Sequence, residues 1–322
     1  MIGMRKGSLE YWPHRRAKKV MPRMRSTPNS NTASFLTYAA FKAGMTHVMM
    51  IDDSLSPSKG TEVAKAVTVL EMPHVYVYGA RFYRKGYAYK EVLGEAYDKK
   101  LAERLGIKKH GHSIDELSKR AAEFVDVSAL AFLDPEGIGF GNKRLMRFEM
   151  PVGGGSAEDK LKFVQGFIGK ELKAGDVIHT GEYIDVSSIS KGKGWSGVIK
   201  RYGVSRQYRK ATNKVRHVGT LGPWHPPKVM FGVPQAGHMG YNYRTELGKR
   251  VLKVGNASDA KTVNAMGGFL NYGVVRNDFM VVEGTIPGPS KRLVRIRKSL
   301  RRHEAAKELM LTYISTASKQ GA

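Results

Sequence analysis

Several short motifs carry residue types that could bind a cofactor or a phosphate group. The most serious is Asp134-Pro135-Glu136-Gly137-Ile138-Gly139-Phe140-Gly141, which follows a predicted strand and could form the glycine-rich loop of a cofactor-binding methyltransferase. Glu158 and Asp159 stand about twenty positions later, where an acidic residue would hold a ribose. However, Asn142-Lys143-Arg144 and a second predicted strand follow the loop, whereas a nucleotide loop opens directly into a helix. The sequence therefore disfavours a cofactor-binding loop at this position.

Two other glycine runs fail the same kind of test. A phosphate-binding P-loop requires a Lys-Ser or Lys-Thr pair after its glycines, because the lysine and the hydroxyl meet the phosphates and the metal ion. No such pair follows Gly153-Gly154-Gly155 or Gly192-Lys193-Gly194. We therefore expect the first run to lead flexibly into a helix, and neither run to hold a nucleotide.

Two clusters could suggest a metal site. Asp52 and Asp53 are adjacent, but no third carboxylate or histidine lies at ligand spacing, so the pair is expected to open a turn. His217, His225 and His238 are separated by intervals of eight and thirteen positions, with no carboxylate or thiolate nearby. Contact with RNA or packing is the favoured interpretation of these histidines, and no metal or cofactor is expected.

The strongest chemical signal is a long basic stretch, from Lys191 to Lys253. It contains fourteen lysines and arginines and a single acid, Glu246. Glycine and proline recur throughout, so the stretch is predicted to be an irregular or looped ribbon with no long helix. Fixing such a backbone costs more free energy than burying its apolar side chains, including Trp195 and Trp224, can return. A polyanion would supply the difference through phosphate contacts and through stacking of aromatic rings on bases.

The N-terminal residues 1–25 have the same character. They carry eight basic residues, one acid and two prolines, which is too little apolar material for a core. We expect an arm that becomes ordered on a partner, with Trp12 and His14 available for stacking, and an ordinary disordered tail as the alternative.

The whole-chain composition agrees with a nucleic-acid partner. The chain has 322 residues, a formal net charge of +26, a pI near 10.1 and no cysteine. This length permits a sizeable core, and the missing cysteines exclude disulfides and fit a reducing compartment. No apolar run approaches the roughly twenty residues of a membrane span, and no signal segment follows the N-terminus. The sequence predicts a soluble protein that is not exported, without a membrane partner.

The remaining segments must build the scaffold. Residues 35–80 contain short β-branched and aromatic runs typical of strands, and residues 81–176 combine two helical stretches, two strands and a helix that begins at Ser156. Strands resume at 177–194 and again at 263–297, and an amphipathic helix is expected near the C-terminus, after seven basic residues between Lys291 and Arg302. The fold class is therefore α+β, with a β-barrel that is discontinuous in sequence and an inserted α/β domain.

Several blocks of the chain resemble the archaeal and eukaryotic form of the universal large-subunit ribosomal protein family uL3. They include GSLEYWPHRRAKK, DVSSISKGKGWSGVIKRYG, RHVGTLGPWHPPKVM, QAGHMGYNYRTELGKR and GGFLNYGVVRNDFMVVEGTIPGPSKRLVRIR, and the resemblance extends over nearly the whole chain. The resemblance implies a six-stranded translation-type barrel and an rRNA-binding protein without catalytic residues. It also implies that the arm and central loop enter large-subunit rRNA, and that the loop approaches the peptidyl-transferase centre. His238 departs from the family, which usually has glutamine there, and Arg206 to Asn213 match weakly.

The basic stretches and the resemblance together predict a set of RNA-binding residues. They are Arg15, Arg16, Lys18, Lys19, Arg23, Lys191, Lys193, Lys200, Arg201, Arg209, Lys210, Lys214, Arg216, His217, Trp224, His225, Lys228, Arg244, Lys249, Arg250, Arg292 and Arg295. Trp224 is expected to act as a stacking platform at the loop tip, or alternatively to fold back on Val229 and Phe231.

These inferences define the expected organisation and partners. The predicted segments are a basic rRNA-binding arm (1–25), barrel parts (26–80, 177–194 and 263–297), an inserted α/β domain (81–176), a basic loop extension (195–262) and a basic C-terminal helix (298–322). The expected function is structural, in the cytoplasmic large ribosomal subunit, with rRNA and neighbouring ribosomal proteins as partners. The alternatives are a nucleic-acid-modifying enzyme, such as an RNA methyltransferase, and a basic chaperone or DNA-compacting protein. The last would not require an aromatic loop tip.

Overall fold

The computed structural model of the chain describes residues 11–94, 99–107, 117–118, 120, 123–139, 141–211, 214–302, 309–318 and 320. The chain divides into two compact units. Residues 11–20 and Ile189–Arg244 form one, called the basic unit below. The described residues of Met21–Ser188 and Thr245–Ala322 form the other, called the sheet unit.

The first sheet has seven strands. Their order is β14 (Leu293–Lys298), β9 (Tyr183–Ile189), β12 (Tyr243–Gly255), β13 (Phe279–Glu283), β3 (Glu62–Glu71), β2 (Thr37–Ile51) and β15 (Leu311–Ile314). Strand β14 also pairs antiparallel with β2, from Leu293 opposite Phe41 to Arg297 opposite Thr37. Six strands, β14, β9, β12, β13, β3 and β2, therefore form a closed ring of pairings. Strand β15 pairs with β2 outside this ring. Strands distant in sequence meet here, as predicted for a discontinuous sheet.

The second sheet is antiparallel throughout. Its order is β1 (Ser34–Phe35), β7 (Met146–Gly153), β6 (Asp126–Leu133), β4 (Val75–Arg84) and β5 (Tyr87–Leu93), and β8 (Glu171–Leu172) pairs with β4. Helix α3 (Ala157–Gln165) lies against β6 and β4. Ser156 and Asp159 cap its first turn reciprocally, which confirms the predicted helix start. The rings of Phe163 and Phe167, on and just after this helix, pack 5.0 and 5.2 Å from Phe35.

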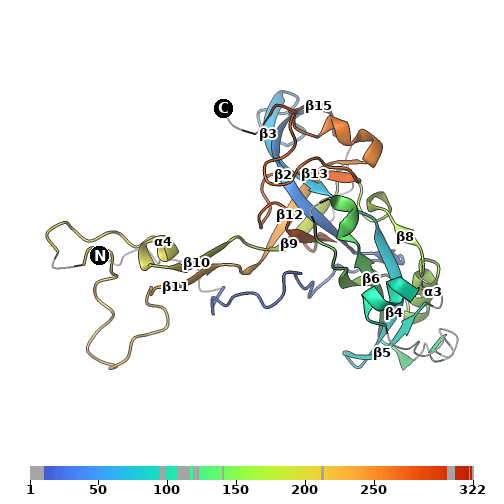
Figure 1. Cartoon of the computed structure of the whole chain (residues 1–322), viewed down its shortest axis with the longest axis horizontal. Coiled ribbons are helices and arrows are strands. Elements are labelled where there is room, and N and C mark those ends of the chain that lie inside the picture. Colours follow the sequence, from blue (N-terminus) through green and yellow to red (C-terminus); the bar gives the residue numbers. More distant parts are fainter. Residues whose placement is uncertain are drawn as a thin grey trace. The chain divides into compact units, whose positions relative to one another are not determined.

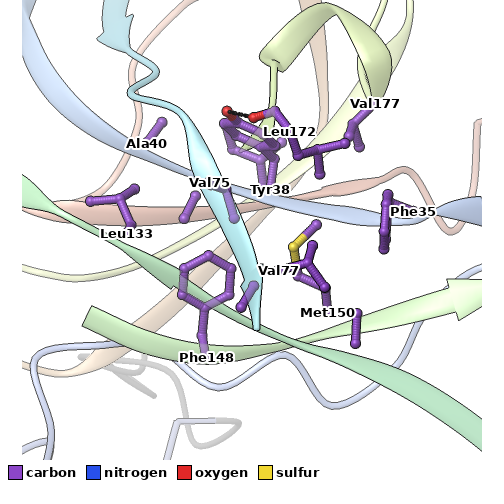
Figure 2. Packing of buried hydrophobic residues seen from close by; sticks show 14 of the residues in the cluster. Phe35, Tyr38, Ala40, Val75, Val77, Leu133, Phe148, Met150, Leu172 and Val177 are labelled. Atoms are coloured by element: carbon purple, nitrogen blue, oxygen red, sulfur yellow. Dashed lines mark hydrogen bonds between the residues drawn. The ribbon is translucent and has the colours of Figure 1, made fainter. Parts of the chain in front are cut away.

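One hydrophobic cluster joins the two sheets (Figure 2). It contains Tyr38 and Leu70 from the first sheet together with Val77 and Phe148 from the second. The burial pattern of strand β3 changes along its length. Its first five residues alternate in exposure, and its last five, which include Leu70 of the cluster, are all buried. The hydroxyl of Tyr38 donates to the carbonyl oxygens of Pro73 (3.0 Å) and Leu172 (3.1 Å), and burial raises the pKa of this phenol. The buried phenol of Tyr38 is thus hydrogen-bonded.

The remaining regular elements are short. They are α1 (Lys99–Leu105), the 3-10 helices η2 (Pro135–Ile138), η3 (Ala174–Asp176) and η4 (Ala257–Thr262), strands β10 (Gly192–Ser196) and β11 (Gly237–Gly240), and α4 (Val198–Tyr202). No helix in the described part of the chain is long and apolar enough to cross a membrane.

Two sequence predictions of local structure are wrong. The C-terminal helix is absent over Leu311–Ile314, which forms β15 on the edge of β2 instead, while residues 303–308 lie outside the described residues. The irregular ribbon ends earlier than predicted, because Tyr243–Gly255 forms β12 between β9 and β13. In both places pairing with a distant strand decides the structure, and local periodicity does not report such pairing.

The glycine-rich run after Asp134 begins with the 3-10 helix η2. Asp134 caps the 3-10 helix η2 by accepting a hydrogen bond from the backbone NH of Glu136. The chain then returns as β7, antiparallel to β6. A strand in place of a helix leaves no helix N-terminus to face a phosphate.

Candidate nucleic-acid interface

A short hairpin forms the stem of the basic unit. Strands β10 and β11 lie side by side (Figure 1). They pair antiparallel, with Gly192 opposite Gly240 and Trp195 opposite His238. Gly240 has a φ of +75°, and a Cβ there would lie 2.0 Å from the carbonyl oxygen of Lys191. Only glycine combines this backbone conformation with so close an approach. Gly240 is therefore a structural requirement of the hairpin.

A five-residue helix, α4, follows the stem. It buries Val198 and Tyr202 and ends at Gly203, whose φ is +66°. Arg201 extends from it to the returning chain, donating from Nε to the carbonyl oxygen of His238 (3.1 Å) and from Nη1 to that of Gln235 (2.9 Å). Its guanidinium also lies 5.1 Å from the centre of the Tyr202 ring. This predicted RNA-binding residue thus holds the two sides of the loop together.

Residues 11–20 of the N-terminal arm are part of the same unit. The backbone NH of Ala17 donates to the carbonyl oxygen of Tyr241 (2.8 Å), and the Asn242 amide donates to the carbonyl oxygen of Arg15 (2.9 Å). These bonds involve the backbone of the arm, so they leave the Arg15 side chain exposed.

Aromatic rings add to the docking of the arm. The ring of Trp12 lies 5.8 Å from that of Phe231, edge to face, and 4.8 Å from that of His14. His14 lies 6.2 Å from Tyr202. Partial burial, and then the charges of Arg201 and Arg244, lower the pKa of His14. The arm therefore presents a neutral imidazole to the extension at neutral pH.

Two cations of the unit lie over tyrosine rings. The guanidinium of Arg16 is 5.2 Å from the centre of the Tyr241 ring, and that of Arg244 is 4.1 Å from the centre of the Tyr11 ring. Each pair joins the arm to the extension through a cation–π contact.

No acidic side chain among the described residues of the basic unit neutralises its positive charge. Residues 11–20 carry four lysines and arginines, Ile189–Arg244 carry eleven, and neither segment contains an aspartate or glutamate. Most of the predicted RNA-binding side chains are exposed. They are Arg15, Arg16, Lys18, Lys19, Arg23, Lys191, Lys193, Lys200, Arg209, Lys210, Lys214, Arg216, His217, Trp224, His225 and Lys228. All but Arg23 belong to the basic unit, and such a concentration of exposed cations attracts a polyanion.

The tip of the unit exposes apolar surface among these cations. Every residue from 221 to 231 is exposed, and Trp224 and Phe231 are exposed by 88% and 68%. An indole folded back on Val229 and Phe231 would be largely covered. The described conformation is therefore not the fold-back alternative, and the indole face is open.

The structure places the other predicted cations differently, and four of them lie in the sheet unit. Arg250 is 12% exposed and pairs with Asp53 through Nη1 to Oδ1 (2.7 Å) and Nη2 to Oδ2 (2.5 Å). Lys249 lies 2.8 Å from Glu246. Arg295 is 3% exposed and donates to the carbonyl oxygen of Glu149 (2.8 Å). Arg292, three positions before Arg295, is half-buried. Arg201 and Arg244 of the basic unit are half-buried as well.

Exposure also marks residues that were missing from the predicted set. Trp195 is 80% exposed, Tyr208 is 69% exposed, and Arg206 is exposed as well. From sequence, the indole of Trp195 was counted among side chains available for a core. The flanking glycines of GKGWSG were the signal that could have found it, because a strand of glycines offers no side chains to cover an indole.

The residues considered for metal binding have other roles. The Asp52 carboxylate accepts hydrogen bonds from the NH of Ser54 (2.9 Å) and the hydroxyls of Ser56 (2.9 Å) and Ser58 (2.5 Å), as the predicted turn requires. These bonds, with that from Ser58 the strongest, lower the pKa of Asp52. Within the described ranges, no three acidic, cysteine or histidine side chains are grouped to hold a metal ion.

Known proteins are similar to this chain over nearly its whole length. The family model described as "Ribosomal protein L3" matches residues 3–111 and 81–321. The large ribosomal subunit protein uL3 of Methanothermobacter thermautotrophicus is 41% identical, and that of Methanobrevibacter smithii is 39% identical, each over 98% of both chains. The uL3 protein of Methanococcus vannielii is 40% identical over 98% of this chain and 97% of its own. By its family match and by its similarity to these relatives, the chain belongs to the ribosomal protein L3 family.

Proposed function

We propose that the protein is a structural component of the large ribosomal subunit and binds its rRNA through the basic unit. One observation carries the proposal: the described residues of the basic unit include no acid and display exposed cations together with exposed aromatic rings. Cations release counterions from phosphates, and aromatic rings stack on unpaired bases, so the pair of features suits RNA. Membership of the ribosomal protein L3 family supports the same conclusion.

In this proposal the sheet unit is a scaffold of the translation-barrel type with an inserted α/β domain. The ring of pairings among β2, β3, β13, β12, β9 and β14 supports the six-stranded barrel. Apart from the short strand β1, the strands of the second sheet begin with β4 at Val75. This sheet supports the inserted domain, and we place the start of that domain at Val75 instead of at residue 81. The arm, residues 1–25, and the loop extension are the rRNA-binding parts, and the loop extends toward the peptidyl-transferase centre.

The RNA-binding residues of the proposal are the exposed ones. Cations of the basic unit meet phosphate, and Trp224 at the tip stacks on a base or enters a narrow cleft of RNA. Arg250 and Arg295 leave this set, because one holds Asp53 and the other is buried in the core. The protein works in the cytoplasm beside neighbouring large-subunit proteins, and it needs no cofactor and performs no catalytic step.

Co-sedimentation tests the proposal directly. A native lysate is separated on a sucrose gradient, and the protein is located with an antibody. We expect the protein to migrate with large subunits at low salt and to be released only by salt high enough to compete with phosphate contacts. Migration of the protein free of large subunits would contradict the proposal.

A further inference from the structure

Trp195 is the largest exposed ring that the proposed tip contact does not use. It lies in β10, at the stem of the basic unit, twenty-nine positions before Trp224, and 80% of its surface is exposed. His238 lies directly opposite it on β11. Side chains of directly opposed residues in an antiparallel pair share one face, so the imidazole borders the indole on that face. The rest of the ring is uncovered.

The backbone around this indole is bare. Gly192 pairs with Gly240, and Gly194 and Gly197 stand on either side of Trp195 and Ser196. A Cβ added at Gly194 or Gly197 would meet no atom within 4 Å. Glycines at such positions let another backbone approach closely, and a ribose–phosphate chain is one such backbone. The stem therefore offers a flat ring with open space beside it.

The charge beside the ring selects the kind of ligand. Lys191 and Lys193 are exposed in the same strand region, and the unit from Ile189 to Arg244 contains no carboxylate that could neutralise them. A partner that satisfies both features must combine a negative charge with a flat π surface. An unpaired nucleotide has both, since its phosphate suits a lysine and its base suits an indole.

We propose that Trp195 is a second stacking platform, for an unpaired nucleotide of RNA, with Lys193 on an adjacent phosphate. The inference rests on the proposed function and adds a contact at the stem, separate from the tip at Trp224. The indole acts through its π face, and the lysine acts through its charge. The two contributions therefore differ in their dependence on salt.

The experiment uses the full-length protein and deproteinised large-subunit rRNA from the same cells. We expect Trp195→Ala to weaken binding about 5- to 150-fold, the range that loss of one stacked base corresponds to. Trp195→Phe should retain most of the affinity, and Trp195→Leu should resemble Trp195→Ala because it lacks a π face. The slope of log K against log salt should stay the same in all three, whereas Lys193→Ala should reduce its magnitude by about 0.7 to 0.9.

Controls separate stacking from other roles of the indole. The melting temperature should be unchanged in Trp195→Ala, because an 80% exposed side chain contributes little to packing. Unchanged RNA affinity in Trp195→Ala would overturn the inference, as would full rescue by Trp195→Leu. Normal RNA affinity with poor incorporation of Trp195→Ala into subunits would indicate a protein partner and would also overturn it. If the wild-type protein fails to bind the rRNA, the proposed function falls as well.

Discussion

Burial divides the basic residues of this protein into two groups with different tasks. Lys210 lies exposed in a unit without carboxylates, and its charge is available to a phosphate. Arg250 is 12% exposed and pairs with Asp53, and this hydrogen-bonded carboxylate raises the pKa of the guanidinium. The sequence places both in one basic stretch. Only the fold shows that one of them already holds an anion.

Substitution of each cation by alanine tests this division. Lys210→Ala should reduce the magnitude of the salt slope of rRNA binding by about 0.7 to 0.9, because one phosphate contact is lost. Arg250→Ala should leave the slope unchanged and lower the free energy of unfolding by about 1 to 3 kcal/mol, because Asp53 loses a charged hydrogen-bond partner. Salt-dependent filter binding and urea unfolding measure the two effects. A flattened slope in Arg250→Ala would contradict the assignment.

At the loop tip, Trp224→Ala should reduce rRNA affinity by about 1 to 3 kcal/mol if a base is its partner. The melting temperature of the free protein should be unchanged, because the side chain is 88% exposed. Binding assays and thermal unfolding provide the two readouts, with Trp224→Phe as the conservative control. A large fall in melting temperature together with normal subunit activity would show that the indole packs within the protein.

His14 provides a prediction on pH. Partial burial, followed by the charges of Arg201 and Arg244, lowers its pKa from the ordinary value of 6.5. Protonation is therefore easier when the arm is undocked, so docking is stable above about pH 6.5 and weakens as the pH falls through that value toward the lower pKa of the docked state. An NMR titration should find the His14 pKa below 6.5, and Arg244→Gln should raise it. A value above 6.5 in the wild-type protein would contradict the docked geometry.

The candidate site was predictable at the level of composition but not of individual contacts. The absence of acids and the glycine and proline content identify the basic loop without a structure. Sequence cannot show that Arg250 meets Asp53, which lies 197 positions away. Sequence cannot show the exposure of Trp195 either, because that exposure depends on which residues the fold places beside the ring.

At the scale of strands, one buried ion pair joins the elements that border the loop extension. Asp185 in β9 is 1% exposed, and its Oδ2 accepts hydrogen bonds from Nε of Arg297 in β14 (3.1 Å) and from the NH of Leu300 (3.2 Å). Its Oδ1 accepts from the NH of Gly248 in β12 (2.9 Å). The carboxylate thus fixes β12 and β14 on either side of β9, just before the chain leaves the sheet.

Removal of the negative charge of Asp185 should destabilise the folded protein. Asp185→Asn should lower the free energy of unfolding by about 3 to 5 kcal/mol, because it leaves a buried guanidinium without its anion. Asp126→Asn is the matched control, since Asp126 pairs with Lys160 (2.7 Å) while its side chain remains 46% exposed. The control should cost under about 1 kcal/mol. Equal effects in urea unfolding would show that Asp185 does not join the strands.

Elements with strong local signals were found from sequence, and elements defined by distant pairing were not. The helix at Ala157–Gln165 has its capping box, and strands such as Asp126–Leu133 have continuous apolar runs. The edge strand Leu311–Ile314 has neither signal. Its conformation comes from hydrogen bonds to β2, some 260 positions earlier. Local pattern and composition contain no information on such a partner.

At the scale of the whole molecule, the two units should differ in stability when RNA is absent. The described residues from 204 to 236 form no helix or strand, and most of them are exposed. Exposed backbone amides without the hydrogen bonds of a helix or strand exchange rapidly. Strands β2 and β3, in contrast, are paired with each other and lie in the buried core. Hydrogen exchange of the free protein should therefore show fast exchange over 204–236 and slow exchange in β2 and β3. Slow exchange throughout both regions would contradict the expectation that RNA orders the loop.

The arm and its docking partner are far apart in the order of synthesis. Ala17 bonds to Tyr241, so 224 positions separate the two ends of that hydrogen bond. At about 5 to 20 residues per second, a translating ribosome needs roughly 11 to 45 seconds to make the intervening chain. During that interval Trp12, Arg15 and Arg16 have emerged without the aromatic rings and the Asn242 amide that later contact them. In every newly synthesised chain this cationic segment is therefore uncovered at first. It is accessible to any nucleic acid until the hairpin stem has been synthesised.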